Sequence, residues 1–130
     1  MFIENDIVSN VLEKTVKHYS YLNSRCLVSE KIVKLDRECR FYVVDGKVIT
    51  GSHYRIADRV KHVKIDDYDE IWKIADEYSK LYQPHDVFVM DIAQVVDEYK
   101  IIEYNCLNAS GLYDSNVALL FKCLIEYQSR

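Results

Sequence analysis

The chain has 130 residues, of which 49% are hydrophobic and 29% are charged, and its formal net charge is -4. This length suits one domain with a hydrophobic core, and the acidic balance argues against a non-specific nucleic-acid binder, which would carry a basic stripe. No apolar run approaches a membrane span, and the N-terminus lacks a basic segment followed by an apolar core, so we expect a cytoplasmic protein with no membrane partner.

The chain contains only three glycines and four widely spaced cysteines. So few glycines exclude a glycine-rich phosphate loop of the Walker or Rossmann kind. No two cysteines form a C-x-x-C pair and each lies in an apolar stretch, so we expect buried free thiols rather than disulfides or a zinc site. The histidines show no metal-ligand spacing. A bound nucleotide would therefore need another device.

The first part of the chain predicts a helix, a strand and a hairpin. Apolar residues recur at helical spacing over residues 6–22, and an extended apolar pattern follows over residues 25–35. Residues 38–50 contain two apolar runs joined by Asp45-Gly46. This dipeptide is the strongest short-range signal for a hairpin with a type I′ turn, in which both central residues need positive φ.

A weaker extended pattern over residues 53–65 predicts another strand, and a helix follows. Asp67 and Glu70 resemble a capping box that opens a helix over residues 68–82. The residues expected to point inward from this helix are Ile71, Trp72, Ala75, Tyr78 and Leu81. Pro84 closes the helix, because proline cannot continue its hydrogen bonding.

Two apolar runs over residues 87–105 predict a second hairpin, and a last helix begins after a polar loop at Asp114 or Ser115. The complete order is helix, three or four strands, helix, two strands, helix. This order predicts an α+β fold, with a mainly antiparallel sheet and helices packed against one face of it. The chain contains no repeat, low-complexity segment or linker, so we expect a single domain over residues 1–130.

The second hairpin carries the best clue to chemistry. Both side-chain parities of its strands are apolar, which indicates that both faces are covered, so a carboxylate at Asp91 needs compensation. Glu103 and Asn105 share a face, and Asp91 joins them if a three-residue loop over residues 96–98 pairs it with Glu103. Two carboxylates and an amide oxygen would suit a hard divalent cation. The alternative is a hairpin whose acidic side chains face solvent or pair with an arginine.

A second group of candidates lies on the first hairpin and just after it, namely Arg40 and Arg55, with Glu38 and Lys47 beside them. An arginine on an apolar strand face needs an anion, and a phosphate fits its planar guanidinium. The alternative is a structural ion pair of Arg40 with Glu38, which shares its face, or with an acidic residue of the second hairpin. Together, the two groups would let carboxylates hold a metal while arginines hold phosphates.

The order of these motifs resembles the C-terminal part of the ATP-grasp superfamily over about residues 25–125, and is most similar to the ATP-grasp domains common in bacteriophages and bacteria. The motifs that carry the resemblance are Val28-Ser29-Glu30, Glu38-x-Arg40, Val44-Asp45-Gly46-Lys47-Val48, Tyr54-Arg55, Asp91-Ile92-Ala93, Glu103-x-Asn105 and Ser110-Gly111-Leu112-Tyr113. The resemblance implies the fold of a C-terminal ATP-grasp lobe.

The resemblance also implies Mg²⁺ and ATP as cofactors and assigns residues to them. The metal ligands it implies, bridging the ATP phosphates, are Asp91, Glu103 and Asn105. The catalytic residues it implies, in contact with phosphates or an acyl-phosphate intermediate, are Arg40 and Arg55. Both arginines, together with Glu38, form the implied cofactor-binding set.

Two functions follow from the resemblance. The first is Mg-ATP binding and ATP-dependent ligation of a carboxylate to an amine or similar nucleophile, on a small-molecule or peptide substrate. We expect the chain to begin where the family's N-terminal ATP-clamping lobe ends, which would make it one lobe of a split enzyme. The second is a catalytically inactive, shortened relative that binds a host or phage protein. Eleven tyrosines are compatible with such a protein partner or with a homo-oligomer. A nuclease-like metal site is disfavoured, because no histidine motif supplies a general base.

Overall fold

The computed structural model describes residues 35–57 and 59–130. The chain divides into two compact units, Met1–Val33 and Lys34–Arg130, and the described residues belong to the second. The predicted N-terminal helix and nearly all of the strand predicted after it lie outside the described residues. In the part that the structure describes, no helix is both long and apolar enough to cross a lipid bilayer.

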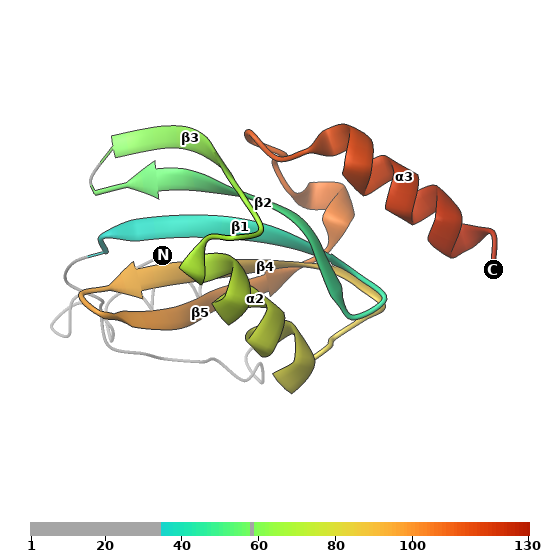
Figure 1. The fold of residues 1–130 in the computed structure, drawn as a ribbon, viewed down its shortest axis with the longest axis horizontal. Helices are drawn as coiled ribbons and strands as arrows, with labels where there is room; N and C mark the ends of the chain where they lie inside the picture. Colours follow the sequence, from blue (N-terminus) through green and yellow to red (C-terminus); the bar gives the residue numbers. More distant parts are fainter. Residues whose placement is uncertain (1–34, 58) are drawn as a thin grey trace, which may run out of the picture. The chain divides into compact units, whose positions relative to one another are not determined.

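Five antiparallel strands form one sheet in the order β3-β2-β1-β4-β5 (Figure 1). The strands are β1 (Arg37–Val44), β2 (Lys47–Ile56), β3 (Arg59–Ile65), β4 (Val87–Val95) and β5 (Glu98–Asn105). The other elements are the helices α2 (Glu70–Leu81) and α3 (Val117–Gln128) and the 3-10 turn η2 (Leu107–Ala109). The predicted α+β class with a mainly antiparallel sheet is therefore confirmed, and β1 is its central strand.

The first hairpin forms as its sequence predicts. Val44 pairs with Lys47 across a two-residue turn, and Asp45 and Gly46 have φ angles of 52° and 73°. Positive φ at both positions is what a type I′ turn requires. The weaker extended segment after this hairpin is divided between the end of β2 and all of β3.

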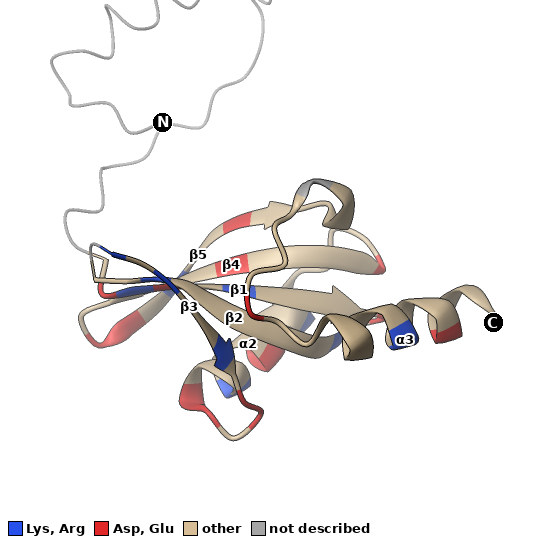
Figure 2. Ribbon diagram, turned by 90° about the horizontal axis from the view of Figure 1, so that it is seen from above, with Lys and Arg blue, Asp and Glu red and all other residues tan. Residues whose placement is uncertain are grey.

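Side chains of the central strands alternate between two apolar clusters. One cluster, which includes α2, consists of Cys39, Phe41, Val43, Ile65, Ile71, Ala75, Phe88, Met90 and Ile92. The other, which includes α3, consists of Tyr42, Val44, Val89 and Leu120. Because successive strand residues point to opposite faces, the two helices cover opposite faces of the sheet. The prediction that the helices share one face is wrong. Figure 2 shows α2 on one side of the sheet and the turn η2 on the other.

The second hairpin reaches its predicted pairing by a different route. Asp91 faces Glu103, as predicted. The three-residue loop predicted over residues 96–98 is wrong, because β4 and β5 are joined by a two-residue turn. This turn alone would place Asp91 opposite Ile102. A bulge in β5 next to Asp91 adds one residue and restores the pairing with Glu103.

The start of α2 differs from the prediction. The helix begins at Glu70, its N-cap is Asp69, and no side chain caps it, so the capping box predicted for Asp67 and Glu70 is wrong. The carboxylate of Asp69 instead accepts a hydrogen bond from the backbone N–H of Asp66 at 3.0 Å. Leu81 was expected to point inward but is 77% exposed, because it lies at the end of the helix beyond the sheet contact.

The start of α3 is also later than predicted. Asn116, rather than Asp114 or Ser115, is the N-cap, and its Oδ1 accepts from the backbone N–H of Leu119 at 3.0 Å. The backbone N–H of Asn116 donates to Oγ1 of Thr50 on β2 at 2.8 Å. This bond fixes the first turn of α3 to the sheet.

Candidate functional site

A buried ion pair joins the two central strands. β1 and β4 pair so that Arg40 lies opposite Asp91. Nε of Arg40 donates to Oδ1 of Asp91 at 2.8 Å and Nη2 donates to Oδ2 at 2.7 Å, a bidentate contact. Asp91 is 2% exposed. In Figure 2 a basic segment of β1 and an acidic segment of β4 lie side by side. The compensation that the apolar strand demanded for Asp91 is therefore supplied by Arg40.

Glu103 and Asn105 extend this pair onto the neighbouring strand. Glu103 lies opposite Asp91 on β5, and its Oε1 is 3.8 Å from Nη2 of Arg40. Nδ2 of Asn105 donates to the same Oε1 at 2.7 Å. The Glu103 side chain is half exposed. The structure thus brings together the three predicted metal ligands, with Arg40 among them.

Glu38 and Arg55 form a second ion pair beside Arg40. One carboxylate oxygen of Glu38 accepts from the hydroxyl of Tyr54 at 2.9 Å. The other, Oε1, is 3.2 Å from Nε of Arg55 but accepts no hydrogen bond among the described residues. Glu38 is buried and the Arg55 side chain is half exposed. Arg55 therefore offers a guanidinium to solvent at the edge of the site.

The environment of the central pair shifts the pKa of both partners. Burial raises the pKa of Asp91 above its ordinary value, and the hydrogen bonds and charge of Arg40 oppose that rise. The hydrogen bond to Asp91 raises the pKa of Arg40, against the effect of burial. Arg40 therefore remains a cation, and its charge is the main support for a carboxylate in this apolar position.

Two aromatic side chains that sequence reasoning did not place in the site lie over Arg40. The Arg40 guanidinium carbon is 5.2 Å from the ring centre of Tyr113 and 5.7 Å from that of Tyr54. These two rings stack at 5.2 Å, and the ring of His62 is 4.9 Å from Tyr113. Tyr54 adjoins Arg55 in the sequence, but Tyr113 belongs to an irregular loop whose contacts no periodicity could predict.

Lys47 does not belong to this site. It lies at the turn of the first hairpin, opposite Val44 and away from Arg40 along β1. Within residues 35–57 and 59–130, no three side chains of the His, Cys, Asp and Glu types gather as a metal cage. A metal at this position would therefore depend on two carboxylates, Asp91 and Glu103, and the amide oxygen of Asn105.

The described cysteines are free, as predicted, but not all are buried. Cys106 is exposed, and Cys123 is partly exposed. Cys39 is buried, and its Sγ lies 2.9 Å from Nδ1 of His53. Burial raises the pKa of the Cys39 thiol and lowers the pKa of His53, so this is a contact between two neutral groups on the α2 face rather than an activated nucleophile.

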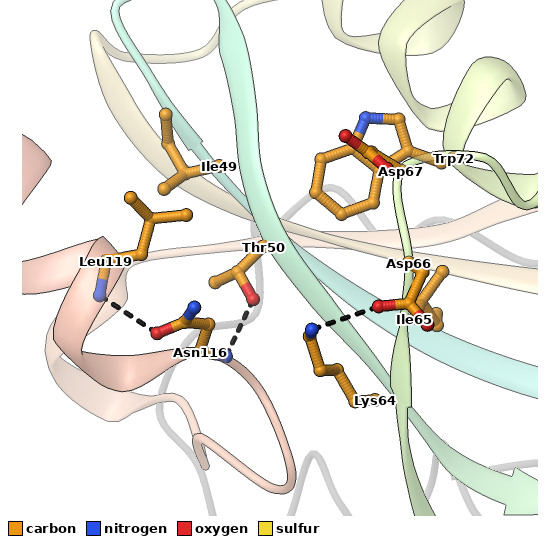
Figure 3. A pocket seen from close by; sticks show the side chains of 9 residues that line it. All are labelled: Ile49, Thr50, Lys64, Ile65, Asp66, Asp67, Trp72, Asn116 and Leu119. Atoms are coloured by element: carbon orange, nitrogen blue, oxygen red, sulfur yellow. Dashed lines mark hydrogen bonds and ion pairs between the residues drawn. The ribbon is translucent and has the colours of Figure 1, made fainter.

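A separate hollow of about 230 Å³ lies between α2, α3 and the end of β3 (Figure 3). Its lining residues are Ile49, Thr50, Lys64, Ile65, Asp66, Asp67, Trp72, Asn116 and Leu119. Lys64 pairs with Asp66 at 2.9 Å across one wall, and Thr50 and Asn116 are joined by a hydrogen bond on another. None of the predicted site residues lines this hollow.

Comparisons with known proteins address the fold and the family. The solved structure of the ATP-grasp ligase PsnB complexed with minimal precursor is similar, with a TM-score of 0.51 and 20% sequence identity. The match covers 78% of this chain and 37% of that chain, so this chain spans well under half of its length. At this identity the similarity shows a common fold. No curated relative matches the chain.

A family model is more decisive, because it covers most of the sequence. The model of an ATP-grasp domain family, numbered 3 within its clade, matches residues 2–124. This match includes Arg40, Arg55, Asp91, Glu103 and Asn105. It agrees with the motif order that suggested an ATP-grasp lobe and with the five-stranded antiparallel sheet that carries these residues. The chain therefore belongs to this family of ATP-grasp domains, and so to the ATP-grasp superfamily.

Proposed function

We propose that the corner formed by Asp91, Glu103 and Asn105 binds Mg²⁺-ATP and serves ATP-dependent ligation of a carboxylate to an amine or similar nucleophile. The observation that carries the proposal is the row of Arg40, Asp91 and Glu103 across three neighbouring strands. It combines oxygen ligands with a fixed cation at one side of a sheet. The family match supports this chemistry in kind.

The donor set suits Mg²⁺. Magnesium in nucleotide sites is held by one or two carboxylates together with phosphate oxygens and water, rather than by a full protein cage. Glu103 is half exposed, and its Oε2 makes no hydrogen bond within the described residues. Each oxygen of Asp91 accepts one hydrogen bond from Arg40, which leaves a further lone pair on each. When bound, the metal would neutralise charge on the phosphates.

The protein's own cations would supply the remaining electrostatic stabilisation. Arg40 is held rigidly beside the acidic pair, so its charge is preorganised for an anion. Arg55 is half exposed and faces solvent, and it would contact a phosphate or an acyl phosphate. Glu38 makes contact with Arg55 and Tyr54, so we assign it to the cofactor site as the residue that orients Arg55.

The substrate class follows from the comparison. The similar solved structure is of a ligase complexed with its minimal precursor. We therefore propose a peptide or other small carboxylate-bearing substrate for the enzyme to which this lobe contributes. Because the chain spans 37% of that ligase, the complete reaction would need further elements of the ATP-grasp fold.

Calorimetric titration of the full chain with ATP and Mg²⁺ tests the proposal. We expect wild type to bind and Glu103→Ala to bind about tenfold or more weakly, because a metal ligand is lost. Glu103 suits the test since it is half exposed and its removal leaves the Arg40–Asp91 contact intact. Glu98→Ala on the same strand is the control, since Glu98 is exposed and pairs only with Lys100.

Absence of binding by wild type at millimolar ATP would contradict the proposal, and so would equal binding by wild type and Glu103→Ala. One observation favours a second function in that case. Arg40 already compensates Asp91 through two hydrogen bonds, so the pair is stable without a metal. Such an arrangement is what a catalytically inactive relative, acting through a protein partner, would retain.

A further inference from the structure

Arg40 is held on two sides by different kinds of contact. Asp91 fixes its edge through Nε and Nη2. The rings of Tyr113 and Tyr54 lie against its guanidinium at 5.2 and 5.7 Å, and Glu103 is 3.8 Å from Nη2. Nη1 donates no hydrogen bond among the described residues. The contacts therefore fix the plane of the guanidinium while leaving one nitrogen available to a ligand.

The loop that supplies Tyr113 is shaped to hold the ring there. Tyr113 has a φ of 50°, a left-handed conformation that costs a tyrosine about 1–2 kcal/mol and usually marks a functional constraint. Hydrogen bonds to three strands fix the loop on either side of it. These bonds are Tyr42 hydroxyl to Gly111 oxygen, Asp114 N–H to Ser52 Oγ at 3.2 Å, and Lys64 N–H to Asp114 Oδ2 at 3.1 Å.

The position of Tyr113 is not explained by burial of its ring. The side chain is 38% exposed, and it belongs to neither apolar cluster of the sheet. Its ring contacts are with Arg40, Tyr54 and His62. A strained residue that is partly exposed and lies over a buried cation fits a role in orienting that cation better than a role in the core.

We propose that Tyr113 is a positioning residue for Arg40. The aromatic face attracts the guanidinium and stops it from rotating about the Asp91 contact, so that the free nitrogen stays directed at the site. The consequence for nucleotide binding rests on the proposed function. The positioning itself can be tested in the free protein, and the two can therefore fail separately.

Proton exchange at Nε–H of Arg40, measured by NMR on the full chain, reports the positioning directly. The signal is assigned by its disappearance in Arg40→Lys. We expect Tyr113→Asn, which removes the ring but tolerates positive φ, to accelerate this exchange about threefold to tenfold. Tyr113→Phe keeps the ring and should stay within about twofold of wild type. Tyr68→Leu, which removes an exposed tyrosine elsewhere, is the control.

Unchanged exchange in Tyr113→Asn would overturn the inference, as would equal acceleration in Tyr113→Phe or in the Tyr68 control. Tyr113→Gly, which relieves the backbone strain, provides a second ring-free variant if the first is poorly folded. Where wild type binds Mg²⁺-ATP, Tyr113→Asn should weaken that affinity by a similar factor while Tyr113→Phe retains it. If wild type shows no nucleotide binding, the proposed function fails and the exchange result still decides the role of Tyr113.

Discussion

The Arg40–Asp91 contact determines which single residues can be changed informatively. Removing one partner of a buried ion pair leaves an uncompensated charge and costs about 3–5 kcal/mol. Burial already raises the pKa of Asp91, so loss of Arg40 would leave this carboxylate without its main support. Substitution of either residue would therefore confuse loss of function with loss of folding. Glu103, which is half exposed, avoids this difficulty.

His53 should make the stability of the protein depend on pH. Burial, and next the charge of Arg37, lower its pKa below 6.5, while Asp69 acts in the opposite direction. Below pH 6.5 the unfolded chain takes up a proton at His53 that the folded protein resists, so stability present above pH 6.5 is lost as the pH falls. We expect the free energy of unfolding to fall between pH 7 and 5.5 by up to about 1 kcal/mol more in wild type than in His53→Gln.

Urea denaturation at several pH values measures this difference. His85→Gln serves as the matched control, because His85 is exposed, and its pH dependence should follow wild type. Identical pH dependence in wild type and His53→Gln would show that His53 does not contribute.

At the scale of single residues, alternation along strands made much of the site predictable. Glu103 and Asn105 had to share a face, and a carboxylate at Asp91 had to be compensated. The compensating partner was left open, because pairing between β1 and β4 is not encoded locally. Tyr113 could not be placed, since its position depends on loop hydrogen bonds to strands distant in the sequence.

The strand elements are matched to one another by close packing as well as by hydrogen bonds. Gly51 on β2 lies opposite Phe41 on the central strand β1. A Cβ at Gly51 would come within 2.5 Å of the Phe41 ring, and Phe41 is fully buried. The absence of a side chain at position 51 is therefore what lets the aromatic ring occupy the core beneath α2.

We expect Gly51→Ala to lower the free energy of unfolding by about 1–3 kcal/mol, because the buried ring cannot move away without disturbing the core. Thermal or urea denaturation measures the effect. The double variant Gly51→Ala with Phe41→Leu should cost less than the sum of the two single changes. Gly111→Ala is the control, because a Cβ there meets only ordinary contacts from 3.5 Å. Full additivity in the double variant would contradict the steric account.

At the scale of elements, the features encoded locally were predicted and those set by packing were not. The Asp45-Gly46 turn was found because its backbone conformation depends on those two residues. The bulge in β5 was missed. It keeps Ile101 opposite Ile92 near the hairpin end while turning Glu103 toward Asp91. Which residue a bulge displaces depends on the apolar cluster that the strand must meet, and this is a tertiary constraint.

The unit as a whole has two apolar layers, one on each face of the sheet. Apolar residues at both parities of β4 were the sequence signal for two covered faces, but helical spacing alone could not assign each helix to a face. The layer under α3 is the smaller one and shares its face with the site. Leu120 is the buried residue of α3 in this layer.

Leu120→Ala should therefore lower the free energy of unfolding by about 2–5 kcal/mol, because a fully buried side chain is lost from the smaller layer. Phe121→Ala removes a larger side chain from the same helix but should cost less than about 1 kcal/mol, since Phe121 is 53% exposed. Urea denaturation of the two variants provides the comparison. A larger cost at Phe121 would mean that the outer face of α3 is covered in solution.

The ion pair between β1 and β4 also selects the correct assembly of the sheet. Only one alignment of these strands sets Asp91 against a cation. A slip of two residues would set it against Glu38, a second carboxylate, or against Tyr42, and in both cases a buried charge would lack its partner. Such a charge costs several kcal/mol, so misaligned sheets would be rejected before the helices close over them. We expect the residues of the site to enforce strand alignment even when no ligand is bound.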